Sequence, residues 1–402
     1  MERRSSRTSY PMRRQDPLAP PPALSVMRQS EPVCPVRLWD GSSAWLVTRH
    51  ADVRSVLADS RVSADPRSAG YPFLSAGRAA APDGRGSFNH LDPPEHDRFR
   101  RMLSGEFTVQ RIAGLRPAVQ RAVDTSIDAM IAGGTQADLI QALALPVPSS
   151  VICALLGVPY EDHAFFETRT AYRMDLNAAP SLVRAANREI MEYLDRLVAE
   201  KSRKPGDDLV SRLIQRHGLS ADLEHDDLVD IVRLLLVNGY ETTANMIGLG
   251  VLAILRNPEQ AAVLRRNPPP ETVERTVEEV LRHQTIVHIA PTRAVLEELT
   301  IGGITMRPGD GVITALGSAN RDETVFSDPD TLDVSREARG HLAFGHGIHH
   351  CLGHTLARLE LQIVFGTLFR RLPSLRLGMP FEDVRFKEDM GLYGVHRLDV
   401  AW

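Results

Sequence analysis

The hydrophobic pattern along the chain is mostly that of amphipathic helices. Apolar residues return every three or four positions, with Pro or Gly near the boundaries, in the segments 95–106, 115–132, 149–156 and 182–201. Further helices are predicted over 227–256, over 270–283, and from Cys351 to about Arg371. Together these segments predict a mainly α protein.

The segment 227–256 predicts an unusually long helix. At 1.5 Å per residue, about 30 residues span roughly 45 Å, enough to cross the whole molecule. Its most apolar part, 234–255, is interrupted by Asn238, Glu241 and Asn245. Polar side chains at such positions are costly inside a bilayer, so the pattern favours a buried core helix over a membrane span.

β-structure is predicted only in short pieces. Apolar runs on either side of the turn at Asp40-Gly41 predict a hairpin over 36–47. Small strands are expected around 301–304 and 308–311, where glycines provide the turns. The Gly-, Pro- and Ser-rich stretch 64–90 predicts a long surface loop.

The chain shows no internal repeat and no interdomain linker. We therefore expect one α-rich domain over 23–402. Residues 1–22 carry several arginines and a proline cluster, without the apolar core of a signal peptide. This composition predicts a poorly ordered N-terminal tail.

Composition and charge exclude several functions. The chain has 402 residues, 43% of them hydrophobic, and 47 basic residues face 51 acidic ones. This balance leaves no net field for nucleic acid or for an anionic membrane surface. Only three cysteines are present, which is too few for a disulfide framework and indicates a reducing cytoplasm. Lys201, Lys204 and Lys387 are the only lysines, and every other basic residue among the 47 is an arginine.

Candidate chemistry concentrates in the segment 341–353, where Cys351 lies between a glycine-rich loop and the start of a helix. Glycines let backbone N–H groups approach the sulfur, and together with the positive helix end they favour a thiolate, which is a strong metal ligand. A lone cysteine is more often buried and inert, as expected for Cys34 and Cys153. A zinc site at His346, His349, His350 and Cys351 would lack the paired ligand spacing of structural zinc sites.

The loop resembles the haem-binding loop of the cytochrome P450 superfamily, in the pattern Phe344-Gly345-x-Gly347-x-His349-x-Cys351-x-Gly353. The resemblance implies the single-domain fold of that family, mainly α with small β-sheets and a long central helix over a buried haem b. It also implies that Cys351 is the axial ligand of the haem iron. Glu279-x-x-Arg282 matches the family's Glu-x-x-Arg helix, and Arg336 would complete a structural triad.

A second motif is similar to the family's oxygen-activation motif, at Asn238-Gly239-Tyr240-Glu241-Thr242-Thr243. The resemblance implies that Glu241 and Thr242 deliver protons at a local opening of the long helix. Asn238 departs from the family, which usually has Ala or Gly there. An acid and a hydroxyl in an apolar helix both need partners, which agrees with a functional role.

The resemblance also assigns residues that hold the haem and line the substrate pocket. His96, Arg100, Arg293 and His349 match the contacts to the haem propionates, and cations facing carboxylates make strong hydrogen bonds. The family's pocket walls correspond here to Phe73, Leu234, Val237, Asn238, Ile289 and Leu392.

The implied function is that of a bacterial, actinomycete-type haem-dependent monooxygenase without a membrane anchor. It would insert one oxygen atom of O2 into a hydrophobic small molecule, by hydroxylation or epoxidation, in the tailoring of a polyketide- or macrolide-like secondary metabolite. The chain has no strand–GxGxxG–helix unit, so electrons would come from a ferredoxin and its NAD(P)H-dependent reductase. We expect a monomer, with a ferredoxin-docking surface around Arg98, His350 and Arg358.

Three other functions remain open from the sequence. The first is oxidation of xenobiotics. The second is a nitric-oxide reductase-like member of the superfamily, whose motif lacks the acid that Glu241 supplies here. The third is a non-catalytic haem-binding protein, which would not need an acid–alcohol pair.

Overall fold

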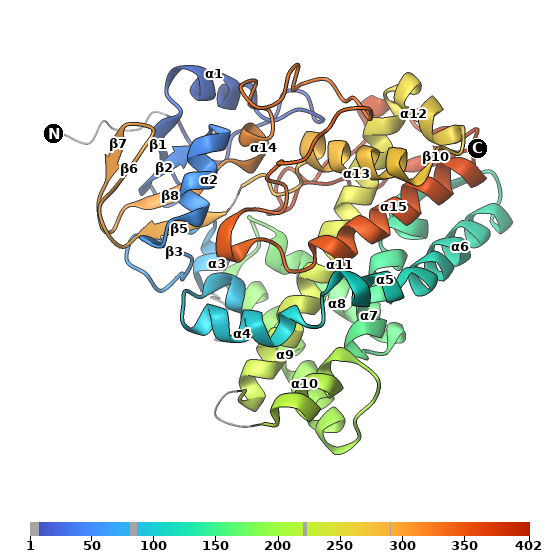
Figure 1. Ribbon diagram of the computed structural model, residues 1–402, viewed down its shortest axis with the longest axis horizontal. Coiled ribbons are helices and arrows are strands. Elements are labelled where there is room, and N and C mark those ends of the chain that lie inside the picture. Colours follow the sequence, from blue (N-terminus) through green and yellow to red (C-terminus); the bar gives the residue numbers. More distant parts are fainter. Residues whose placement is uncertain (1–7, 81–86, 220–222, 290) are drawn as a thin grey trace.

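The computed structural model describes residues 8–80, 87–219, 223–289 and 291–402. The larger sheet lies at one end of the molecule, and helices fill the rest, with the C-terminus at the helical end (Figure 1). The helices are α1 (Pro22–Ser30), α2 (His50–Ala58), α3 (Ala76–Ala80), α4 (Glu95–Ser104), α5 (Val109–Gly114), α6 (Arg116–Ala132), α7 (Pro146–Leu156), α8 (His163–Met174), α9 (Pro180–Arg203), α10 (Leu209–His217), α11 (His225–Leu255), α12 (Pro258–Arg265), α13 (Pro270–Gln284), α14 (Leu316–Ala319) and α15 (His354–Arg371). The strands are β1 (Val33–Arg37), β2 (Ser43–Val47), β3 (Val62–Ser63), β4 (Gln136–Asp138), β5 (Thr292–Val295), β6 (Leu299–Ile301), β7 (Ile304–Met306), β8 (Gly311–Thr314), β9 (Arg376–Leu377) and β10 (Asp399–Ala401).

The mainly α fold predicted from the periodicity is confirmed. The seven predicted helices correspond to α4, α6, α7, α9, α11, α13 and α15. Helix α15 begins at His354, three residues after Cys351, because a 3-10 turn at Gly347–His349 and a turn at Leu352-Gly353 precede it. The predicted surface loop 64–90 contains α3 and a 3-10 turn at Phe88–His90, while its residues 81–86 lie outside the described part of the chain.

The predicted hairpin forms the edge of a five-stranded sheet with strand order β1-β2-β8-β5-β3. Strands β1 and β2 pair antiparallel, with Cys34 opposite Leu46. Strand β2 then pairs parallel with β8, with Trp45 opposite Val312, and β8 pairs antiparallel with β5. Strand β5, which carries Arg293 and is buried along its length, therefore lies between β8 and β3 in this sheet.

Residues 8–21 differ from the predicted poorly ordered tail. Ser9 bridges to Arg37 beside β1, and the side chain of Tyr10 is buried. The guanidinium of Arg14 lies 3.8 Å from the centroid of the Tyr393 ring. Apolar and aromatic contacts thus fix a segment whose composition alone indicated disorder, and residues 1–7 lie outside the described part.

Helix α11 runs through the core, between α7, α9, α13 and α15 (Figure 1). Two glycines permit this close packing. A Cβ on Gly239 would lie 2.6 Å from the Ile152 side chain of α7, and one on Gly250 would lie 2.6 Å from Phe365 of α15. Glycine inside a helix costs about 0.5–1 kcal/mol relative to alanine. At these two positions the closer approach of the neighbouring helices offsets that cost. No helix among the described residues is both long and apolar enough to cross a membrane.

Candidate functional site

The cysteine loop is shaped by glycines and packs against α2. Gly345 and Gly347 have φ of +73° and +72°, and a Cβ on Gly347 would lie 2.3 Å from the Leu57 carbonyl oxygen. The Cys351 N–H donates to the Phe344 carbonyl at 2.9 Å, which closes the loop. The Cys351 side chain is exposed and lies just before α15.

The thiol of Cys351 has opposing electrostatic influences. Its side chain keeps accessible surface, yet protein atoms surround the sulfur closely enough that burial raises the pKa of the thiol. The backbone N–H groups of Gly353 and His354 and the guanidinium groups of Arg100 and Arg358 act to lower it. The predicted donors are therefore present, but in the protein alone they do not outweigh burial.

Four cationic or imidazole side chains gather from separate elements. His96 and Arg100 lie one turn apart on α4, Arg293 is on β5, and His349 lies in the cysteine loop. The rings of His96 and His349 meet edge to face, with centroids 4.5 Å apart. Burial, together with the charges of Arg293 and His96, lowers the pKa of His349 to about 2.

This cluster has unused hydrogen-bonding capacity. His96 Nε2 and His349 Nδ1 are buried without a hydrogen-bond partner in the described structure. Arg293 is buried and donates to the carbonyl of Thr292 at 2.8 Å. Asp97 Oδ1 lies 2.8 Å from His96 Nδ1, and the charge of Asp92 acts on Arg293. Buried donors of this kind fit an anionic group such as the propionates of a haem.

The oxygen-activation motif lies at the middle of α11. Asn238 is exposed and Thr242 partly exposed, although nearly every neighbouring residue is buried. They are four residues apart, so they share one face of the helix. The Thr242 hydroxyl donates to the Asn238 carbonyl at 2.8 Å, and α11 is continuous from His225 to Leu255. The predicted local opening of the helix is therefore not present in this structure.

Glu241 faces away from solvent. It is 6% exposed, and its Oε2 has no hydrogen-bond partner in the described structure. Burial raises the pKa of this carboxyl, and the positive charge of Lys387 partly opposes the rise. A buried acid next to an accessible hydroxyl is an arrangement able to hold and transfer a proton.

The three residues of the predicted triad lie together in the core. Arg282 Nε lies 2.7 Å from Glu279 Oε2, and Arg336 Nε lies 3.2 Å from Glu279 Oε1. Glu279 and Arg282 are fully buried, and Arg282 also donates to the carbonyls of Asn320 and Pro329. The triad thus joins α13 to the segment that leads into the cysteine loop.

The predicted substrate residues lie on α11 and on three segments outside the named helices and strands. Leu234, Val237 and Asn238 are on α11, and only Asn238 of these is exposed. Ile289 is buried near the loop that carries Leu392, since a Cβ on Gly391 would lie 4.0 Å from Ile289 Cδ1. Phe73 precedes α3, with its ring 5.2 Å from that of Tyr71. The Phe73 carbonyl accepts from Trp39 Nε1 at 2.9 Å, and among the described residues no hydrogen bond or ring contact joins Phe73 to α11.

Sequence reasoning missed two groups near the site. The first is Lys387, which interacts electrostatically with Glu241. The only feature of the sequence that could have drawn attention to Lys387 is that the chain has just three lysines. Glu278 accepts from Arg358 Nε at 2.6 Å and lies 3.1 Å from His341 Nε2. Arg358, expected on a docking surface, is therefore also a structural residue that holds α15 to α13.

Comparison with known proteins agrees with this site. A family model described as Cytochrome P450 matches residues 271–383. The chain is 50% identical over 386 residues to cytochrome P450-SU2 of Streptomyces griseolus, covering 96% of this chain and 94% of the relative. It is 42% identical over 398 residues to pentalenic acid synthase of Streptomyces avermitilis, covering 99% and 98%. The crystal structure of mycinamicin VIII C21 methyl hydroxylase from Micromonospora griseorubida, bound to mycinamicin VIII, superposes with a TM-score of 0.91 at 40% identity, covering 98% of this chain and 100% of that one.

The fold and the site define a protein of the cytochrome P450 class, with a cysteine loop, a cationic cluster and an acid–alcohol pair on a central helix. The chain belongs to the cytochrome P450 family and is a monooxygenase that uses a haem-iron cofactor. Small-molecule substrates, O2 and redox partners come with this membership.

Proposed function

We propose that this enzyme hydroxylates or epoxidises a hydrophobic secondary metabolite, with haem b held by Cys351. The observation that carries the proposal is Glu241, a buried acid with an unpartnered oxygen, beside the accessible Thr242 face of α11. Neither a nitric-oxide reductase-like member nor a passive haem carrier needs such an acid. The exposed amide of Asn238, four residues before Thr242, adds a polar contact for substrate or water.

Each residue of the site has a distinct proposed role. Cys351 would ligate the haem iron, and His96, Arg100, Arg293 and His349 would bind its propionates. Glu241 would take up protons from the solvent side, and the Thr242 hydroxyl would pass them towards the face of α11 that it shares with Asn238. When bound, haem supplies the oxygen activation and one-electron chemistry that amino-acid side chains lack.

The substrate class is supported by the named relatives. They include a mycinamicin VIII C21 methyl hydroxylase and a pentalenic acid synthase, so we propose a polyketide- or macrolide-like substrate. Its pocket would be lined by Phe73, Leu234, Val237, Asn238, Ile289 and Leu392. Titration of the haem-loaded protein with a macrolide lactone and with an aromatic xenobiotic would test this. A spectral shift with the xenobiotic alone would contradict the proposal.

The remaining proposals concern electrons and location. We propose that a ferredoxin and its NAD(P)H-dependent reductase supply electrons to a monomeric enzyme in the cytoplasm. The docking surface would include Arg98, His350 and Arg358, of which Arg98 and Arg358 are partly exposed. The three cysteines of the chain are free, as a reducing compartment requires.

The ligand assignment has a direct test. We expect Cys351→His to bind haem without the thiolate-specific absorption band of the reduced carbon monoxide complex, and to lose monooxygenation. Cys153→Ala, which changes a buried cysteine on α7, is the control and should keep both. Retention of the thiolate band by Cys351→His would show that another residue ligates the iron.

A further inference from the structure

The C-terminal loop, residues 384–396, packs against the face of α11 that carries Glu241. A Cβ on Gly394 would lie 2.1 Å from Asn245 Oδ1, so only glycine fits there. One turn further along α11, a Cβ on Gly248 would lie 3.3 Å from Val395 Cγ2. Asn245 follows Glu241 by four residues, so it lies on the same face of the helix.

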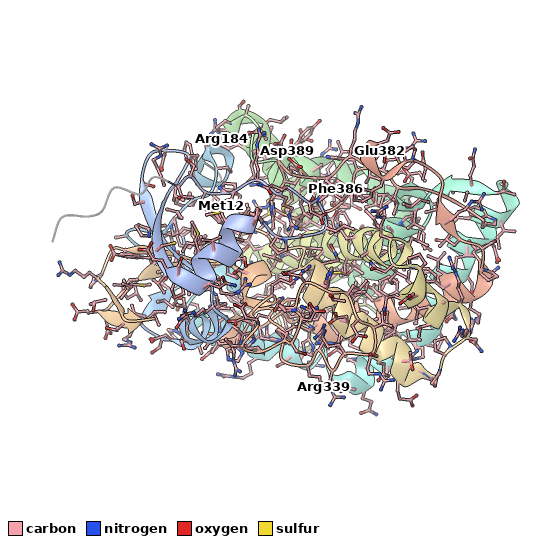
Figure 2. The ribbon with its side chains drawn as sticks, turned by 90° about the horizontal axis from the view of Figure 1, so that it is seen from above. Met12, Arg184, Arg339, Glu382, Phe386 and Asp389 are labelled. Atoms are coloured by element: carbon pink, nitrogen blue, oxygen red, sulfur yellow. The ribbon has the colours of Figure 1, made fainter. Side chains whose placement is uncertain are left out.

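Backbone pairing within the C-terminal loop fixes where Lys387 lies. The Lys387 N–H donates to the Gly394 carbonyl at 2.9 Å, and Phe386 bridges to Val395. Lys387 is therefore paired with the residue that touches Asn245, beside the turn of α11 that begins with Glu241. In Figure 2, the labelled Phe386 and Asp389 lie on the opposite side of the molecule from Arg339.

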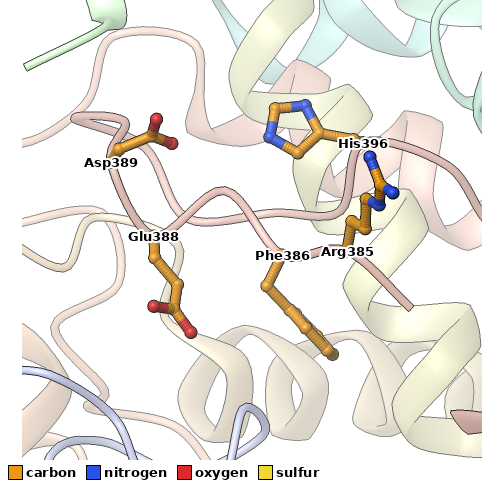
Figure 3. Close-up of a pocket in the computed structure, with 5 residues that line it drawn as sticks. All are labelled: Arg385, Phe386, Glu388, Asp389 and His396. Carbon is orange, nitrogen blue, oxygen red and sulfur yellow. The ribbon is translucent and has the colours of Figure 1, made fainter. Parts of the chain in front are cut away.

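The other residues of the loop line a surface hollow of about 650 Å³, formed by Arg385, Phe386, Glu388, Asp389 and His396 (Figure 3). Solvent thus reaches the outer face of the loop, while Lys387 is only partly exposed. Burial lowers the pKa of Lys387, and the charge of Glu241 acts to raise it. No direct ion pair joins the two groups in the described structure, so they interact through space or through water.

We propose that Lys387 is a positioning residue for Glu241, and that its ammonium group stabilises the ionised carboxylate so that the acid can accept protons arriving from the hollow. The proposal rests on the proposed role of Glu241 in proton delivery and extends it to a second element. A buried carboxylate without such a partner would remain protonated, and it could then pass on one proton but not take up the next.

The charges around Lys387 are few and can be tested separately. Glu241 faces it from α11, and within the loop Lys387 interacts with His396, which Asp389 and Arg385 also influence. Of the three lysines, Lys201 pairs with Asp208 at 2.7 Å and Lys204 is exposed. A lysine-specific probe therefore reports on Lys387 almost alone, with two internal references.

The test is a titration of the haem-loaded protein after reductive methylation of its amines with ¹³C-formaldehyde. Nuclear magnetic resonance should show three dimethyl-lysine signals besides the N-terminus, with the Lys387 signal assigned as the one absent in Lys387→Arg. We expect Glu241→Gln to shift the midpoint of Lys387 to lower pH, by more than any change at Lys201 or Lys204. Glu388→Gln, which removes an exposed acid adjacent in sequence, is the matched control and should leave it in place.

Turnover provides the second readout. Lys387→Met should move the pH profile of coupled product formation to higher pH, whereas Lys387→Arg should restore the original profile because it keeps the charge. An unchanged Lys387 midpoint in Glu241→Gln would overturn the proposal even if the enzyme is a competent monooxygenase. Conversely, the titration shift can be observed even if the proposed substrate or reaction is wrong.

Discussion

At the scale of single residues, we propose that Thr242 and Asn238 direct protons on the accessible face of α11. The Thr242 hydroxyl donates to the Asn238 carbonyl at 2.8 Å, so it is held by its own helix and yet remains accessible. Removing it should not disturb the fold, because neither residue packs in the core. The accessible amide of Asn238 offers a second group able to hold a water molecule on this face.

We therefore expect Thr242→Ala to bind haem and substrate normally but to lose coupling. The variant would consume NAD(P)H and O2 while releasing hydrogen peroxide, because protons are no longer directed by the hydroxyl. Thr242→Ser, which keeps the hydroxyl, is the control and should stay largely coupled. Peroxide and product measured per NAD(P)H give the result, and Asn238→Ala added to Thr242→Ala should worsen it. Full coupling in that double variant would contradict the relay.

At the scale of elements, buried charges join helices to the cysteine loop. Glu279 on α13 accepts from Arg282 of the same helix and from Arg336, and it also accepts the Asp333 N–H at 3.0 Å. One carboxylate thus fixes the path of the chain between α14 and the loop. The neighbouring Glu278 does the same for α15, through Arg358 and His341.

Glu279→Ala should leave two arginines without their carboxylate in the core. Removing one partner of a buried ion pair typically costs about 3–5 kcal/mol, so we expect low soluble yield and loss of haem. The matched control is Glu274→Ala, because Glu274 is an exposed residue of the same helix and should cost little. Haem content per protein and thermal denaturation measure the effect. Equal stability of the two variants would show that the triad does not hold the structure together.

The elements also show what the sequence could predict. Periodicity and turn residues located seven helices and the first hairpin, because these depend on neighbours within a few positions. The cluster of His96, Arg100, Arg293 and His349 could be proposed only through family resemblance, since its members come from three distant parts of the chain. The interaction of Lys387 with Glu241 had no motif at all, because it depends on how the C-terminal loop packs over α11.

At the scale of the whole molecule, His288 links three distant segments. Its backbone carbonyl accepts from the Tyr10 hydroxyl at 3.3 Å, and its ring nitrogen Nε2 lies 2.9 Å from the Met390 carbonyl. The segment after α13 is thereby tied both to residues 8–21 and to the C-terminal loop. The Met390 carbonyl can only accept a hydrogen bond, so His288 Nε2 must carry a proton and donate it. A neutral imidazole with its proton on Nε2 is sufficient for this hydrogen bond.

The ionisation of His288 should make the stability of the molecule depend on pH. Burial and then the charge of Arg14 lower the pKa of His288 to about 4, while an unfolded chain would have a pKa of about 6.5. Below pH 6.5 the unfolded chain therefore binds a proton that the folded protein excludes. The stabilisation is complete above pH 6.5 and is lost as the pH falls towards 4, by on the order of 2–3 kcal/mol in all.

We expect His288→Asn to remove most of this dependence, because asparagine can donate a hydrogen bond to the Met390 carbonyl but does not titrate in this range. The variant should be somewhat less stable than the parent at pH 7.5, where the parent ring fits better, and the difference should shrink or reverse at pH 5. Thermal denaturation of the haem-loaded proteins at both pH values measures this. His225→Asn, which changes a partly exposed histidine that lies 2.7 Å from Asp195, is the control and should not reproduce the effect of His288→Asn. An identical fall in stability between pH 7.5 and 5 for the parent and His288→Asn would mean that the link among the three segments does not depend on a neutral ring.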